Sequence, residues 1–228
     1  MRNLLLIATI LFSGMLAKAQ DIFFPTKKGT VLEYKVYDKN EKETGMVRYT
    51  ITDVTSSGDN TYITYLLESV DANDKPIFKE EITISKRGDK LFVDMSKFLN
   101  KAAFKQGGEI PGEIEISGNE MEIPSNLKLG DILPDSNVEM ALKMGFINLK
   151  MSADVSDRKV EAVENVTVEA GSFDTYKLTS TVSAKALGMK TSTSSAEWIA
   201  KGVGMVKSES YDKKGNVTSH TELVSFKE

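Results

Sequence analysis

The sequence has 228 residues, a formal net charge of −4, 40% hydrophobic residues and no cysteine. Without cysteine there can be no disulfides, thiolate metal sites or cysteine nucleophiles, and no acylated cysteine as a lipoprotein anchor. An acidic chain without a basic cluster is a poor ligand for nucleic acid or for an anionic membrane surface. What remains is an ordinary globular composition, long enough to bury a sizeable core.

The first 19 residues predict a secretory signal peptide. Arg2 provides a positive start, residues 4–16 form a short and almost uncharged apolar run, and Ala17-Lys18-Ala19 fits a cleavage site. The run is too short to predict a membrane span, so we expect no transmembrane segment in the mature chain. We therefore expect cleavage after Ala19 and export to the periplasm or the cell exterior.

The first half of the chain predicts β-strands, because short alternating runs are separated by polar turns about every ten residues. The turns include 38–42, 56–60, 71–76 and 87–90. The third run is apolar on both faces, which predicts a central strand covered on both sides. The predicted strands of this half are 31–37, 46–55, 62–70, 77–86 and 91–95.

The periodicity changes at Phe98, Leu99, Ala102 and Ala103, which fit one helical stripe and predict a short helix over 96–106. Irregular chain over 109–135 follows, with one strand at 113–117. Two hairpin turns are expected near Gly171 and in 212–216. The predicted strands of the second half are 137–144, 146–156, 158–168, 174–186, 190–200, 203–211 and 217–226.

These elements predict an all-β protein. Residues 20–228 should form a single domain, a large antiparallel meander curled into an open barrel or half-barrel with one short helix. Curling protects the sheet edges and provides the apolar side chains with an interior.

Catalytic and metal-binding patterns are weak. His220 is the only histidine, so a zinc site or a serine triad would have to use it, and no G-x-S-x-G motif positions a serine. Acidic pairs such as Glu113/Glu115 and Glu120/Glu122 could serve a glycosidase, but the same spacing is typical of a solvated strand face. The chain is therefore expected to be non-enzymatic, with no metal and no cofactor.

The methionines and aromatic residues suggest a binding face instead. Methionine adapts to varied apolar partners, although it also fills ordinary cores. The lone tryptophan lies in a predicted strand, where it can serve the core or a ligand. The residues predicted to line a ligand on the concave side of the sheet are Tyr65, Phe146, Met151, Tyr176 and Trp198.

Three tracts resemble a known family. Residues 166–178 resemble the pattern V-x-V-x-A-G-x-F-x-x-Y-K, and residues 198–207 resemble its companion W-x-A-x-G-V-G-x-V-K. Residues 24–34 resemble the family's opening tract, with Tyr34 where members often carry tryptophan. The chain thus resembles the exported β-barrel domains of unknown function, TapB-like, of Gram-negative bacteria. The resemblance implies an antiparallel barrel or half-barrel in the envelope and brings no catalytic residues.

Three functions remain open at this point. The first is a non-catalytic envelope protein that binds an apolar or amphipathic, lipid-like ligand, or a protein partner, on the concave face. The second is a purely structural or interaction module with a packed core. The third is a hydrolase. An apolar cavity of a few hundred cubic ångströms would favour the first, and a filled interior the second. The oligomeric state is left open.

Overall fold

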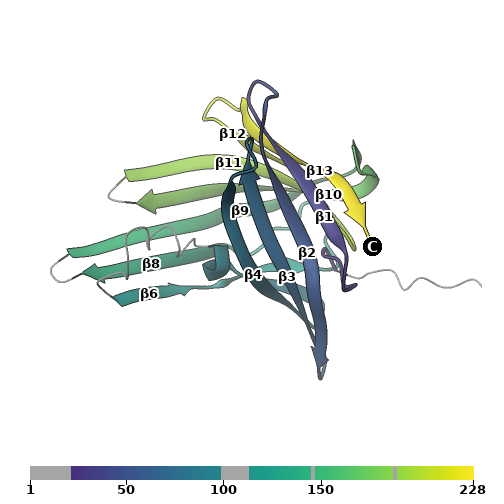
Figure 1. Ribbon diagram of the computed structural model, residues 1–228, viewed down its shortest axis with the longest axis horizontal. Helices are drawn as coiled ribbons and strands as arrows, with labels where there is room; N and C mark the ends of the chain where they lie inside the picture. The colour runs from purple at the N-terminus through teal and green to yellow at the C-terminus, as the bar shows by residue number, and fades with distance from the viewer. Residues whose placement is uncertain (1–21, 99–112, 145–146, 187–188) are drawn as a thin grey trace, which may run out of the picture.

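The computed structural model describes residues 22–98, 113–144, 147–186 and 189–228. The predicted signal peptide and Phe146 lie outside these residues. The described chain forms one antiparallel sheet of 13 strands, in the order β6-β8-β9-β10-β11-β12-β13-β1-β2-β3-β4-β5-β7. Figure 1 shows this sheet curled into a nearly closed barrel, as the sequence predicts. None of the helices in the described residues is long and apolar enough to cross a membrane.

The strands are close to those expected from the alternating pattern. They are β1 (Val31–Asp38), β2 (Glu43–Ser57), β3 (Asn60–Asp71), β4 (Pro76–Arg87), β5 (Lys90–Asp94), β6 (Glu113–Gly118), β7 (Glu120–Pro124), β8 (Ser136–Met144), β9 (Ile147–Val168), β10 (Gly171–Ala186), β11 (Met189–Ala200), β12 (Gly204–Tyr211) and β13 (Val217–Lys227).

Three hairpins share one turn chemistry. Asp71 Oδ1 accepts hydrogen bonds from the amides of Asn73 (2.9 Å) and Lys75 (3.0 Å). Asp38 and Asp212 each accept two comparable amide bonds in the turns that follow β1 and β12. Asp212 also accepts a hydrogen bond from the side-chain amide of Asn216 (3.0 Å). All of these bonds favour the charged carboxylate, so they lower the pKa of the three aspartates. The carboxylate of Asp71 is thus engaged by its own turn.

The structure differs from the sequence prediction in three places. In β3 only Ile63, Tyr65 and Leu67 are buried, and the opposite face is more open, with Tyr62 37% exposed. Residues 147–168 form one strand, β9, because a register shift absorbs the irregularity instead of breaking the strand. β7 was not predicted, because its five residues lie in a tract rich in glycine and proline.

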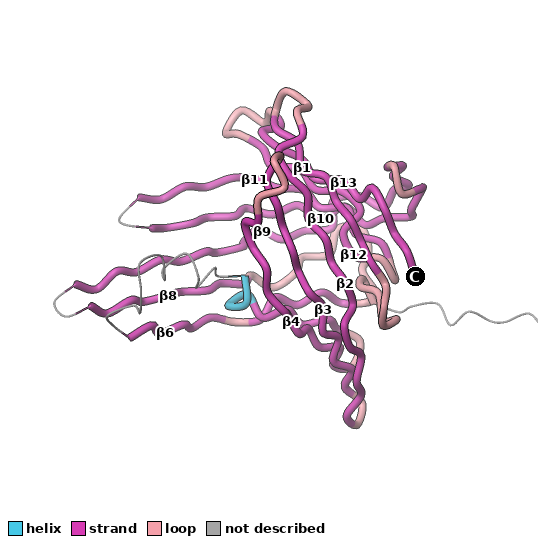
Figure 2. The backbone as a smooth tube through the Cα atoms, viewed as in Figure 1, coloured by secondary structure: helices cyan, strands magenta, loops and turns pink. Residues whose placement is uncertain are grey.

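The predicted helix over 96–106 is only partly within the described chain. A single-turn 3₁₀ helix, η1 (Met95–Phe98), begins one residue early, and residues 99–106 lie outside the described part. Figure 2 shows η1 as one short helical turn beside β8, among the strands of the described chain.

The barrel is closed by a single segment of chain. β6 pairs with β8 at one end of the sheet, and β7 pairs with β5 at the other, with only Asn119 between them. Asn119 secures this junction, since its amide donates to Asn137 O (3.1 Å) and its Oδ1 accepts from the Asn137 amide (2.6 Å). Residues 113–124 therefore join the two ends of the same sheet.

Replacing Gly118 with alanine should destabilise this junction. A Cβ atom there would lie 2.3 Å from the backbone oxygen of Asn137, which cannot move without disturbing the β6–β8 pairing. We expect a loss of about 2 kcal/mol in the free energy of unfolding, measured by urea denaturation. Gly58→Asn is the control, because Gly58 has a left-handed φ of 56° that asparagine tolerates and nothing lies within 4 Å. Equal stability of the two variants would contradict the close approach.

The sequence-distant ends of the chain meet in the middle of the sheet. β1 pairs with β13 from Val31↔Lys227 to Asp38↔Ser219 and with β2 on its other side. Leu32, Tyr34 and Leu223 are fully buried along this seam, and Tyr34 donates its hydroxyl hydrogen bond to Met205 O (3.0 Å). The seam is therefore part of the core rather than an edge.

Candidate functional site

The interior of the barrel is occupied by the segment that precedes β1. Phe23 packs edge-on against Tyr176 with ring centroids 5.3 Å apart. The rings of Phe24 and Tyr65 also pack together, with centroids 5.1 Å apart. The amide of Gly202 donates to Ile22 O (2.8 Å), which fixes this segment to the turn between β11 and β12. Two of the predicted ligand-lining residues, Tyr65 and Tyr176, thus contact the protein's own chain.

The inward cavity that remains is small. Its volume is about 30 Å³, enough for little more than water. It lies between β7, the connector after β7, β9, β10 and β11. Its lining is apolar except for two charged residues and two hydroxyl residues in the middle of β10: Met121, Ile123, Leu133, Val155, Arg158, Leu178, Thr179, Ser180 and Glu197.

Arg158 is the buried cation of this cavity. The residue is 5% exposed, and its Nη1 donates to the carbonyl oxygen of Pro134 at 2.7 Å. Within the described chain no carboxylate lies within 4.0 Å of its guanidinium, which is the limit for an ion pair. Burial lowers the pKa of Arg158, while the charges of Glu197, Asp135 and Glu122 oppose that shift. Most of its five donors therefore have no acceptor in the described chain.

Glu197 lies on the other side of the same cavity. Its partner in the sheet is Leu178, so the side chain is on the inner face, and it reaches the open part of the concave side, where solvent contacts it. Desolvation by the surrounding wall raises the pKa of its carboxyl, and the Arg158 cation opposes that rise. The cavity thus has one positive and one negative wall.

Beyond this cavity the sheet continues outward. Figure 1 shows β6, β8 and β11 projecting past the wall formed by β1–β4. We call residues 138–143, 149–155, 180–186 and 189–195 the projecting sheet. Cross-strand pairing places one row of apolar side chains on the face that also bears Leu178: Val138, Met140, Leu142, Met151, Ala153, Val155, Val182, Ala184, Ala186 and Met189.

The projecting sheet is amphipathic. The β8 residues of its inner face, such as Met140, are buried, whereas Ala184 is exposed and Met189 is 70% exposed. The opposite face bears charges, including the ion pairs Lys143–Glu115 (2.7 Å) and Lys150–Glu139 (3.2 Å). On β11 the inner face turns polar toward the cavity, through Thr191, Thr193 and Ser195 to Glu197. An apolar track thus leads from the tips of the strands to the Arg158–Glu197 cavity.

The structure separates the predicted ligand-lining residues. Tyr65 and Tyr176 lie in the filled interior, and half-buried Met151 lies on the inner face of the projecting sheet. Trp198 pairs with Lys177 and Lys207, so it lies on the face opposite Tyr176. The fifth, Phe146, is outside the described residues. Ligand contact by these residues stays a prediction.

Trp198 is held by polar neighbours on the outer face. Its Nε1 donates to Glu164 Oε1 at 2.6 Å, and the ammonium groups of Lys177 and Lys207 lie 5.3 and 5.6 Å from the ring centroid. The side chain is 8% exposed. The cation–π geometry and the hydrogen bond together explain why an apolar ring lies on a charged face.

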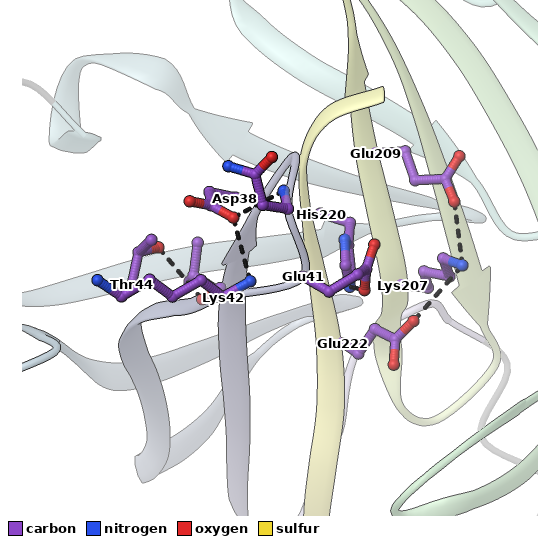
Figure 3. A network of polar contacts seen from close by, with 10 residues as sticks. Asp38, Glu41, Lys42, Thr44, Lys207, Glu209, His220 and Glu222 are labelled. Carbon is purple, nitrogen blue, oxygen red and sulfur yellow. Dashed lines mark hydrogen bonds and ion pairs between the residues drawn. The ribbon is translucent and has the colours of Figure 1, made fainter. Parts of the chain in front are cut away.

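His220 belongs to a surface network. Figure 3 shows it beside Glu41, and its Nε2 lies 3.5 Å from Glu41 Oε2 while its ring stacks on Tyr37. Lys207 joins Glu209 and Glu222 in the same region. In the described chain no group of three or more histidine, aspartate or glutamate residues could hold a metal ion.

The acidic pairs considered from the sequence are engaged with basic partners. Glu120 contacts Arg87, Glu122 lies 2.7 Å from Lys90, and Glu115 lies 2.7 Å from Lys143. Glu113 begins β6. The carboxylates of these three residues are therefore paired with cations rather than with each other.

Arg158 and Glu197 were not singled out from the sequence. The signal was present, because each occupies an inward position of an alternating strand. Arg158 shares its face with fully buried Val160, and Glu197 shares its face with Ile199. A charged residue in such a register is unusual and indicates a special site or a structural bond.

A model of the DUF3108-like family matches residues 27–223. The chain belongs to the DUF3108-like family. No curated protein matches this DUF3108-like chain. The family match does not address the narrower TapB-like resemblance, which stays a prediction.

Two crystal structures share the fold of this DUF3108-like protein. One is a Bacteroides fragilis protein whose name assigns it as exported and gives it a YmcC-like fold; it has 19% identity and a TM-score of 0.73, with 90% of this chain and 99% of that chain covered. The other is a Parabacteroides distasonis protein assigned as a lipoprotein, with 20% identity, a TM-score of 0.73, and 90% and 98% covered. At these identities the likeness concerns the fold alone.

Proposed function

We propose that this DUF3108-like protein is an exported, non-catalytic binding protein, and that it holds an amphipathic, lipid-like ligand on the inner face of the projecting sheet. One observation carries the proposal. The apolar inner face extends beyond the filled barrel and ends at exposed Ala184 and Met189. Exposed apolar surface bordered by polar residues is typical of binding sites.

The shape of this face favours an acyl chain. The seven residues from Ser180 to Ala186 span about 20 Å at the usual rise of a strand. An acyl chain in one leaflet of a bilayer spans about 15 Å, half of the hydrocarbon core. On β8, β9 and β10 the track is apolar over most of this length, and it becomes polar at the cavity with Arg158 and Glu197, so it suits a molecule with one apolar and one polar end.

Export is supported by the predicted signal peptide and by the names of the two structural neighbours, one assigned as exported and the other as a lipoprotein. An envelope location is where lipid-like ligands are abundant. The TapB-like resemblance points to the same compartment. A non-catalytic role is supported by the pairing of Glu115, Glu120 and Glu122 with cations and by the contacts of His220 with Tyr37 and Glu41.

The test is native mass spectrometry, with lipid extraction, on protein purified from its own envelope. We expect a co-purifying lipid-like species. Ala184→Asp should lower its recovery at least about tenfold, because a charge on the inner face must be desolvated when the ligand binds. Ser183→Asp is the matched control, since the neighbouring residue points to the opposite face. Repeated recovery of empty wild-type protein, or equal loss in both variants, would count against the proposal.

A second function is favoured by the filled interior. The inward cavity of about 30 Å³ is far smaller than the several hundred cubic ångströms of a typical ligand pocket. A structural or interaction module of an envelope assembly would need no larger cavity. Under that alternative, the same extraction would yield no lipid, and a protein would co-purify with the wild type.

A further inference from the structure

We propose that Arg158 and Glu197 together select a ligand head group of zero net charge, which presents a hydrogen-bond acceptor to Arg158 and a donor to Glu197. This inference rests on the proposed function and names the chemistry of the polar end of the ligand. A head group with an ester and hydroxyls meets both requirements. Simple carboxylates and quaternary ammonium groups each meet at most one.

Arg158 and Glu197 lie at the inner end of the apolar track. Both line the cavity of about 30 Å³, together with Val155 and Ser180 of β9 and β10. Val155 pairs with Val182, the next inward residue along β10, so the cavity opens at the inner end of the apolar track. A ligand whose chain lies on the track therefore has its head group at the mouth of this small cavity, next to Arg158 and Glu197.

Arg158 can donate more hydrogen bonds than the described chain accepts. Its guanidinium has five donors, and the described chain supplies one acceptor, Pro134 O. None of its nitrogens is both fully buried and unpartnered, so the remaining donors contact solvent, and an acceptor brought by a ligand would replace that water with a charge-assisted hydrogen bond. Glu197 accepts hydrogen bonds when ionised and has no hydrogen-bond partner in the described chain, so a hydroxyl of the ligand can donate to it.

The charges of Arg158 and Glu197 balance each other at this cavity. Arg158 and Glu197 offset each other across the cavity, and the other carboxylates that act on Arg158 do not favour an anion either. Glu122 is already paired with Lys90 at 2.7 Å, and Asp135 is exposed and screened by solvent. An anionic head group would meet the repulsion of Glu197, and a cationic one the repulsion of Arg158. A neutral head group meets neither.

The experiment compares three amphiphiles with the same twelve-carbon chain, each below its micelle concentration: dodecanoate, monododecanoyl glycerol and dodecyltrimethylammonium. Binding to the full mature chain is measured by isothermal titration calorimetry. We expect the neutral glyceride to bind about tenfold more tightly than either ion. Glu197→Gln should bring dodecanoate to within about twofold of the glyceride, because it removes the repulsion and leaves the Arg158 cation.

Glu161→Gln is the matched control, since it removes the same charge from an exposed carboxylate that pairs with Lys177 on the opposite face. It should leave the preference unchanged. Arg158→Gln should shift the preference toward dodecyltrimethylammonium; if that variant does not fold, Glu197→Gln decides alone. Binding of none of the three amphiphiles would overturn the proposed function. Equal binding of dodecanoate and the glyceride, unchanged by Glu197→Gln, would overturn the head-group inference only.

Discussion

Replacing Phe23 with alanine should lower the free energy of unfolding by about 3–4 kcal/mol, one of the two largest effects expected in this molecule. Phe23 is 2% exposed and packs against Tyr176, and its cluster also contains Leu133, Val160 and Ile199. Loss of the ring would leave a cavity between the β9–β11 wall and the connector after β7. Urea denaturation followed by circular dichroism measures the change.

Tyr62→Ala is the control for this prediction. It removes an aromatic ring of similar size from β3, but the side chain is 37% exposed, so its loss should cost less than about 1 kcal/mol. A Phe23→Ala variant as stable as Tyr62→Ala would show that the segment before β1 does not hold the interior together. The filled barrel, and with it the reason for placing a ligand outside it, would then be lost.

Trp198→Ala should have a comparable effect on stability, about 3–4 kcal/mol, and no effect on ligand binding by the folded protein. The indole is buried, its Nε1 bonds to Glu164, and Lys177 and Lys207 lie over its ring. All of these contacts are on the outer face. Affinity for monododecanoyl glycerol, measured by calorimetry under conditions where the variant is folded, should stay within about twofold of wild type.

Met189→Ala should show the opposite behaviour. The side chain is 70% exposed at the tip of β11, so its loss should change stability by no more than about 0.5 kcal/mol. Because it ends the apolar track, its loss should weaken binding of the glyceride. If Trp198→Ala impaired binding while Met189→Ala did not, the ligand would have to lie on the outer face.

The fold was predictable because its alternation is regular. Aspartate and glycine residues mark the turns beside strands such as Val31–Asp38 and Asn60–Asp71. The barrel then follows because the sheet must cover its apolar face. β7 was not predictable in the same way, because its existence depends on pairing with β5 and not on local propensity.

The candidate site was predictable only in part. Met151 was chosen for its chemistry, and the structure places it on the apolar track. Trp198 also fits a ligand by its chemistry. Alternation along a strand shows which residues share a face, but it does not show whether that face is the inner or the outer one until the register is known. Arg158 and Glu197 approach one another across strands that are not adjacent, β9 and β11, so no spacing in the sequence could reveal them.

Under the proposed export, the pairing of β1 with β13 would set the order in which the strands fold. The strand that emerges first from a translocation pore finds its second neighbour only when the last strand has followed it. Half of its backbone hydrogen bonds must wait until the entire polypeptide has crossed the membrane. The β1–β13 pairing thus fits a proposed route in which the chain is exported unfolded and folds afterwards.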